Sequence, residues 1–134
     1  MSTRRYALDP VALVRLVEEG VSPGPDLQLV GPTALRSDAL AILLARTRAG
    51  RTSEREALEL HERMTGLRVR LLGDRVSRRR AWDLAVANGW EDLRDAEYLA
   101  VAMLQADGLV AGGPRLATRA AGIVTVVDFT VLRG

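Results

Sequence analysis

Short apolar runs alternate with amphipathic helical patterns along nearly all of this chain of 134 residues. One or two helical patterns separate each pair of neighbouring runs. The runs expected to be strands are residues 5–8, 27–30, 67–71, 108–111 and 123–127. Strands joined through helices form parallel sheets with helices on both faces. We therefore expect a single α/β domain over residues 1–134, with three α/β/α layers and a central parallel sheet of about five strands.

The first run, Arg5-Tyr6-Ala7-Leu8-Asp9-Pro10, is expected to be the central strand and to lead directly into a helix. Pro10 suits the first position of that helix, and Asp9 suits the N-cap before it. Asp9 would then lie at the carboxyl edge of the sheet, where α/β folds bind their ligands. A purely structural cap explains Asp9 equally well. A further role for Asp9 therefore depends on other carboxylates converging on it.

All nineteen basic residues are arginine, and the chain contains no lysine. This disfavours proteins of similar shape that handle phosphate with a lysine, such as two-component receiver domains, haloacid-dehalogenase-like phosphatases and P-loop enzymes. The net charge is only +2. If several acidic residues gather in one pocket, the remaining surface is more basic than that sum suggests. Nucleic acid is therefore a plausible partner.

The chain contains no cysteine, which excludes disulfides and thiolate chemistry and agrees with a reducing cytoplasm. It also shows no apolar signal core and no apolar run of membrane-spanning length. We expect a soluble, cytoplasmic protein that does not enter a membrane.

Two further carboxylates fall on helix faces that are expected to be buried. Asp38 has apolar neighbours around it at 100° per residue, namely Ala34, Leu35, Ala41, Ile42 and Ala45. Asp95 lies in the first turn of a helix over Arg94–Ala106 and shares its face with Tyr98 and Leu99. A buried carboxylate costs several kcal/mol unless its charge is compensated. Pairing with an arginine or with backbone amides would compensate it, and so would binding a metal ion.

Asp9, Asp38 and Asp95 can meet if the strand before Asp9 is central. Three such carboxylates repel one another unless a cation holds them together. A hard divalent ion with oxygen ligands is suited to this role. Mg²⁺ or Mn²⁺ with open coordination positions supports phosphodiester hydrolysis, because it activates a water and stabilises the charge that grows on the phosphate.

The remaining motifs have mainly structural interpretations. Ser53 is expected to cap a helix that ends near Gly66, and Asp74 or Ser77 to cap another that ends at residues 88–89. The lone His61 lies among charged neighbours and is expected at the surface. The basic run at residues 78–80 is either a solvated face or a contact with phosphates or a partner.

Several segments together resemble a PIN domain, and most closely the VapC-like toxins of bacterial toxin-antitoxin pairs. The resemblance covers nearly the whole chain, and its strongest segment is Asp95-Ala96-x-Tyr98-Leu99-Ala100. The segments that carry it are Tyr6–Asp9, Ala34–Leu40, Arg94–Ala100, Ala106–Val110 and Pro114–Leu116.

The resemblance implies a metal-dependent endoribonuclease that hydrolyses RNA with one or two Mg²⁺ or Mn²⁺ ions. By position, the catalytic and metal-binding acids would be Asp9, Asp38 and Asp95, and Asp92 could contribute through a water. VapC-like toxins typically form homodimers and are inhibited by a small antitoxin that reaches into the acidic pocket, often with an arginine. The residues expected to contact RNA or antitoxin are Arg36, Arg94 and Arg115.

The sequence departs from the family at several positions. A further acid often precedes the Arg-Leu pair, and Gly113 stands there. Asp38 replaces the usual Glu, and Leu93 and Ala111 stand where Thr or Ser is common. Asp107 is a poor substitute for the missing acid because it precedes its strand, about 13 Å from the other end at ~3.3 Å per residue.

Two alternatives to a nuclease follow. One is a PIN-like domain that binds RNA or an antitoxin without efficient cleavage. The other is an unrelated α/β domain for a small phosphorylated ligand, which the lack of a glycine-rich phosphate loop disfavours.

Overall fold

Within residues 3–133, four parallel strands form the sheet, in the order β3-β2-β1-β4. We describe a computed structural model of the chain, which covers residues 3–133. The strands are β1 (Arg4–Leu8), β2 (Leu27–Pro32), β3 (Val69–Leu72) and β4 (Gly108–Val110). β1 pairs with β2 on one side and with β4 on the other, so the strand that precedes Asp9 is central, as predicted. β3 lies at the edge of the sheet, where its alternating pattern predicts it.

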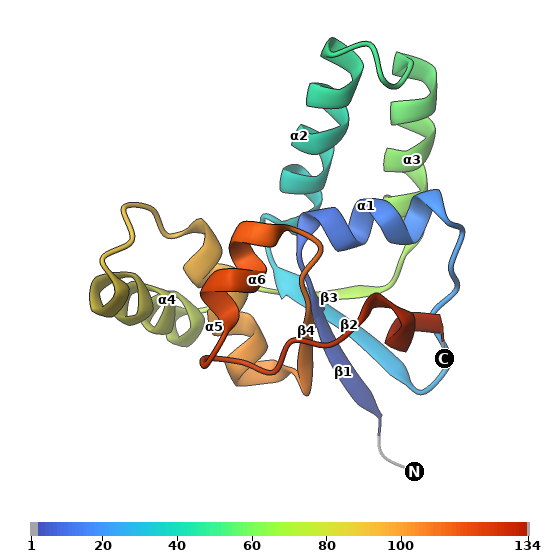
Figure 1. Ribbon diagram of the computed structural model, residues 1–134. Coiled ribbons are helices and arrows are strands. Elements are labelled where there is room, and N and C mark those ends of the chain that lie inside the picture. Colours follow the sequence, from blue (N-terminus) through green and yellow to red (C-terminus); the bar gives the residue numbers. More distant parts are fainter. Residues whose placement is uncertain (1–2, 134) are drawn as a thin grey trace.

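Helices cover both faces of the sheet. α1, α2 and α3 pack against one another, whereas α5 packs against β1 and β2 and carries α4 on its outer side. Figure 1 shows these two groups on opposite sides, with α2 and α3 extending side by side away from the sheet. The three-layer α/β/α prediction is therefore confirmed. The helices are α1 (Pro10–Glu18), α2 (Leu35–Arg48), α3 (Glu54–Gly66), α4 (Arg75–Asn88), α5 (Arg94–Gln105) and α6 (Pro114–Ala120), followed by a 3-10 helix (Phe129–Arg133).

Local capping signals determine where α1, α3 and α4 begin and where α4 ends. The side chains of Asp9, Ser53 and Asp74 each accept a hydrogen bond from a backbone N–H three residues later. Gly89 adopts the left-handed conformation with φ of 66° and ends α4. These contacts satisfy backbone groups that the first and last turns of a helix leave unpaired.

The prediction of about five strands is wrong, because residues 123–127 do not form a strand. Only Val126 pairs there, in an isolated parallel bridge to Leu109. The backbone N–H groups of Ile123 and Val124 instead donate to the carbonyl of Ala120 and close a turn after α6. The chain then enters the 3-10 helix at Phe129, so too few residues remain for a ladder.

The burial of α2 also differs from the prediction. Its buried residues are Leu35, Ala39 and Leu43, whereas Ala41 and Ala45 are exposed. α2 packs mainly against α1 and α3 and extends beyond the sheet, which leaves much of its surface in solvent. Asp38 therefore lies beside the buried stripe of α2 rather than at its centre.

The core is aliphatic, as the low aromatic content predicts. Its largest fully buried side chains include Leu8, Leu13, Leu16, Leu99 and Leu109. None of the helices within residues 3–133 is both long and apolar enough to span a membrane.

Candidate functional site

Asp9, Asp38 and Asp95 line one pocket of about 380 Å³, which we call the acidic pocket. Asp9 follows β1, and the other two lie in the first turns of α2 and α5. The pocket lies outside the carboxyl end of β1, next to the loop that follows β4. The chain leaves β1 toward β2 and returns to the other side of β1 at β4, so the order of strands reverses here. Parallel α/β sheets bind their ligands at such a reversal.

The Asp9 carboxylate is held by two backbone amides. It is 1% exposed. Its Oδ1 accepts a hydrogen bond of 2.8 Å from the N–H of Ala12, and its Oδ2 accepts one of 2.8 Å from the N–H of Gly113. Asp9 thus caps α1 and also fixes the loop between β4 and α6. Each oxygen has a second lone pair that these bonds leave free.

The Asp38 carboxylate is paired with Arg94. Nη1 of Arg94 donates to both carboxylate oxygens, at 2.7 and 2.8 Å, and the hydroxyl of Tyr98 donates to Oδ2 at 2.8 Å. Burial acts to lower the pKa of Arg94, but the hydrogen bonds and charge of Asp38 outweigh it, so this pKa is raised. Burial, together with the hydrogen bond to Asp38, raises the pKa of Tyr98 far above its ordinary value.

Two arginines hold the Asp95 carboxylate. Nε of Arg115 donates to Oδ2 at 2.9 Å and its Nη2 to Oδ1 at 3.3 Å, while Nη1 of Arg119 donates to Oδ2 at 2.9 Å. The hydrogen bond to Asp95 raises the pKa of Arg115. Arg119 also stacks over the ring of Trp90, 4.8 Å from the ring centroid. Because the Arg115 side chain is 67% exposed and that of Arg119 only 25%, Arg119 is the more firmly held of the two.

The chemistry of the pocket suits a hard divalent ion, since it offers three carboxylates. The side-chain positions of the described residues do not form a metal site. No three acidic, histidine or cysteine side chains within residues 3–133 are grouped so that they could hold a metal ion. An ion would have to displace Arg94 from Asp38 and Arg115 from Asp95. The Arg94 side chain is 48% exposed, so both arginines have open solvent into which they can turn.

Three other acidic or basic residues that the sequence singles out do not line the acidic pocket. Arg36 donates to the carbonyls of Met64 and Leu67 and thereby holds the end of α3. Asp92 accepts a hydrogen bond of 3.2 Å from the backbone N–H of Arg94 at the start of α5, and it does not line the pocket. Asp107 accepts a hydrogen bond from the N–H of Arg5 at the opposite edge of the sheet, as its place before β4 predicts.

Sequence reasoning missed Tyr98 and the N–H of Gly113 as components of the pocket, and it missed Arg119 as a partner of Asp95. Three missed groups result: Tyr98, Arg119 and this N–H. The spacing of the side chains could have indicated the first two. Tyr98 is four residues after Arg94 on α5, and Arg119 is four residues after Arg115 on α6, so each pair shares a helix face. Nothing in the sequence pattern points to the backbone N–H.

Comparisons with known proteins bear on the fold alone. No family model matches the chain, and no curated protein matches it. Among solved structures, the chain is similar to PAE2754 from Pyrobaculum aerophilum, known from a crystal structure, with a TM-score of 0.70 and 21% sequence identity. The match covers 99% of this chain and 96% of the other. The two proteins therefore share their architecture along nearly their whole lengths.

Proposed function

We propose that this chain is a PIN-like, VapC-like domain that acts as a metal-dependent endoribonuclease and hydrolyses RNA phosphodiester bonds at the acidic pocket. One observation carries the proposal. Asp9, Asp38 and Asp95 come from three distant parts of the chain, yet all three line a single pocket at the carboxyl edge of the sheet. They lie at the edge where parallel α/β sheets bind their ligands, and the partners of Asp38 and Asp95 include partly exposed arginine side chains that a ligand can displace.

In this proposal the three carboxylates hold Mg²⁺ or Mn²⁺, which would supply an activated water and neutralise charge on the phosphate. The backbone amides of Ala12 and Gly113 keep Asp9 in one orientation, and the hydroxyl of Tyr98 orients Asp38. Arg94 and Arg115, once released from the carboxylates, would bind RNA phosphates at the rim of the pocket.

The test is RNA cleavage by the purified protein with Mn²⁺, compared with D38N and D95N. Asp83, which pairs with Arg79 on the surface of α4, provides the matched control D83N. We expect cleavage by wild type and D83N, abolition by a chelator, and a loss of at least about a hundredfold in D95N, as for other residues that stabilise a transition state. Folded wild type that neither cleaves RNA nor binds Mn²⁺ by calorimetry would refute the proposal.

The second candidate is a PIN-like domain that binds RNA or an antitoxin without efficient cleavage. The arginine pairs favour it, because Arg94, Arg115 and Arg119 already compensate the charge of Asp38 and Asp95. The absence of an acidic side chain at Gly113 also favours it, since a fourth carboxylate would strengthen metal binding. Under this candidate, D38N and D95N alter RNA affinity but there is no metal-dependent cleavage to lose.

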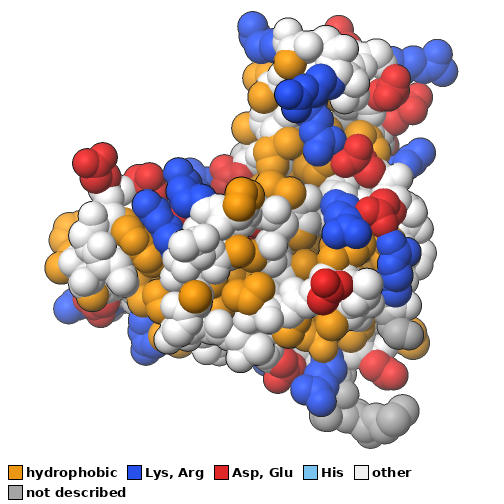
Figure 2. All heavy atoms as spheres, viewed as in Figure 1, with side chains coloured by type: hydrophobic (Ala, Val, Ile, Leu, Met, Phe, Trp, Pro, Cys, Tyr) orange, Lys and Arg blue, Asp and Glu red, His pale blue; other side chains and the backbone are white. Residues whose placement is uncertain are grey.

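The partners implied by the resemblance, a small antitoxin and a second copy of the chain, stay predictions. An apolar groove of about 600 Å³ between α2 and α3, which includes the exposed Leu44 and Leu58, is a suitable surface for an antitoxin helix. Figure 2 shows hydrophobic side chains on this projecting pair of helices, among arginines and acidic residues. Ser37 and Ala41 line the groove, and Asp38 and Ile42 line the acidic pocket. A partner lying in the groove could therefore reach the pocket around α2.

A further inference from the structure

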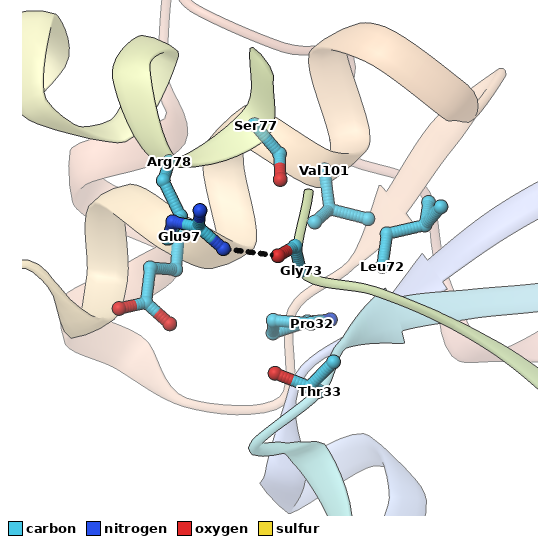
Figure 3. A pocket seen from close by; sticks show the side chains of 8 residues that line it. All are labelled: Pro32, Thr33, Leu72, Gly73, Ser77, Arg78, Glu97 and Val101. Atoms are coloured by element: carbon cyan, nitrogen blue, oxygen red, sulfur yellow. Dashed lines mark hydrogen bonds between the residues drawn. The ribbon is translucent and has the colours of Figure 1, made fainter. Parts of the chain in front are cut away.

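A second, smaller pocket of about 170 Å³ opens at the carboxyl ends of β2 and β3, on the same edge of the sheet as the acidic pocket. We call it the edge pocket. Its polar groups come from Thr33, Gly73, Arg78 and Glu97, and its apolar walls include Leu72 and Val101. In Figure 3 the two charged side chains lie on one side, and Leu72 and Val101 lie on the other.

Glu97 is the unusual residue of the edge pocket. It is half-buried, and no side chain or backbone group of residues 3–133 forms a hydrogen bond or ion pair with its carboxylate. Every carboxylate of the acidic pocket, in contrast, accepts at least two hydrogen bonds from the protein. Because no side-chain oxygen among the described residues is buried without a partner, the Glu97 oxygens are open to solvent. They can therefore accept hydrogen bonds from a ligand without first losing a protein partner.

Arg78 supplies the complementary chemistry. Its Nη1 donates to the carbonyl of Gly73 at 2.5 Å, which places the guanidinium at the pocket, and the remaining N–H groups have no other acceptor among the described residues. The pocket thus offers two acceptor oxygens from Glu97 beside free donors from Arg78. Arg78 belongs to the basic run at residues 78–80, to which the proposed endoribonuclease function gives no role.

We infer that the edge pocket binds an unpaired guanine base of the RNA substrate. Guanine presents two adjacent donors, N1–H and the N2 amino group, which match a carboxylate, and its O6 and N7 are acceptors that match an arginine. No other RNA base has two adjacent donors on its Watson–Crick edge. The cavity has room for a base rather than a whole nucleotide, and the half-buried Leu72 provides an apolar wall for the ring, whereas Val101 is only 1% exposed and offers little surface. Bases of single-stranded RNA are commonly read in this way.

This inference rests on the proposed function for its RNA ligand. The two pockets lie along one edge of the sheet. The acidic pocket lies at the ends of β1 and β4, and the edge pocket lies at the ends of β2 and β3. Neighbouring strands are about 4.8 Å apart. Glu97 and Arg94 lie three residues apart on α5, and the charge of Glu97 contributes to the raised pKa of Arg94. A strand of RNA with a phosphate at the acidic pocket could therefore place a neighbouring base in the edge pocket, so cleavage would occur close to a guanine.

The test measures binding of fluorescein-labelled hexaribonucleotides, UUUGUU and UUUIUU, by fluorescence anisotropy in EDTA so that the RNA stays intact. Inosine lacks only the N2 amino group of guanosine. We expect wild type to bind the guanosine hexamer at least about fivefold more tightly, the lower end for a good bidentate contact to a base. In E97Q this ratio should fall below about twofold. The exposed Glu91 on the loop before α5 gives the matched control E91Q, which should keep the wild-type ratio.

Arg78 is tested in the same way by R78Q, with R79Q on the same helix as its control. R78Q should weaken binding of the guanosine hexamer more than binding of a uridine hexamer. Equal affinity of wild type for the two hexamers, no binding of either, or an unchanged ratio in E97Q would overturn the inference. An equal loss in R78Q for every hexamer would also overturn it, since it would mark Arg78 as a phosphate contact. A protein that selects guanine but cleaves no RNA with Mn²⁺ would keep this inference and lose the proposed nuclease activity.

Discussion

Replacing Asp9 tests whether its carboxylate holds two parts of the fold together. In Asp9→Ala, the N–H groups of Ala12 and Gly113 both lose their acceptor. Loss of an aspartate N-cap costs about 1 kcal/mol, and an unpaired backbone N–H costs a further 1–3 kcal/mol when buried. Gly113 is only half-buried, so we take the lower end for the second contribution. The free energy of unfolding should fall by about 2 kcal/mol, which for a domain of this size lowers Tm by roughly 6–8 °C.

Asp9→Ser separates the two contributions. A serine hydroxyl can still accept from the N–H of Ala12, because serine is a good N-cap residue, but it cannot also reach Gly113. The expected loss is therefore about 1 kcal/mol, about half of that in Asp9→Ala. Urea denaturation followed by circular dichroism measures both. A loss below about 0.5 kcal/mol in Asp9→Ala, or equal losses in the two variants, would show that these hydrogen bonds do not hold the site.

The same contacts decide how Asp9 can be used in functional tests. In Asp9→Asn, one carboxylate oxygen becomes an NH₂ group, and if that group faces the N–H of Gly113 two donors oppose each other. A loss of activity in Asp9→Asn could therefore result either from a displaced β4–α6 loop or from a lost metal ligand. Asp38 and Asp95 are better choices, because their partners in the structure are flexible arginine side chains and a tyrosine hydroxyl rather than backbone amides.

Three further predictions concern the charges around the sheet edge. Arg94→Gln should tighten Mn²⁺ binding about fivefold, which is the most that a part-exposed ion pair usually contributes. Arg115→Gln should also tighten Mn²⁺ binding. Weaker or unchanged Mn²⁺ binding by calorimetry would contradict displacement of these arginines by the ion. Gly113→Asp should also tighten Mn²⁺ binding, and more than Gly113→Asn does, because it adds a fourth carboxylate beside the pocket. The position can take a side chain, since a Cβ there meets no atom closer than 3.4 Å and φ is −86°. Hydrogen bonds from Ser77 hold the pKa of Asp74 below its ordinary value of 3.8, so this cap stabilises the fold at higher pH and its contribution declines as the pH falls through the lowered pKa. The difference in unfolding free energy between wild type and Asp74→Ala should therefore be constant from pH 5 to 7 and narrow below about pH 4.

The sequence predicts the helices and the central strand well because their signals are local. Asp9 with Pro10, Ser53 and Asp74 mark helix starts through hydrogen bonds to residues three positions away. The last predicted strand fails for the opposite reason. Residues 123–127 are apolar enough for a strand, but whether they pair depends on where the preceding turn leaves the chain relative to β4.

In the candidate site, too, local features could be predicted and long-range contacts could not. That Asp9 lies at the carboxyl edge could be predicted from the chain order, and the three acids do line one pocket. Which arginine pairs with which acid could not be predicted, because Asp38 and Arg94 are 56 residues apart in the sequence and Asp95 and Arg115 are 20 apart. Helical periodicity predicts the face of the helix on which a side chain lies. The side chains that it contacts on other helices depend on how α2, α5 and α6 pack together.

Because the chain has no lysine, the ion pairs of Asp38 and Asp95 are formed by arginine alone. Arginine stays charged at every pH the protein meets, so Asp38 and Asp95 always have a cation available. A divalent ion that displaced both Arg94 and Arg115 would exchange two positive charges for two, and the local charge balance would be unchanged. Arg119, held between Asp95 and the ring of Trp90, would remain in place. Metal binding would then free two exposed guanidinium groups at the rim of the pocket, where they can bind the phosphates of an incoming RNA. Ion loading and RNA affinity should therefore rise together, and RNA binding that is indifferent to Mn²⁺ would separate these arginines from the substrate.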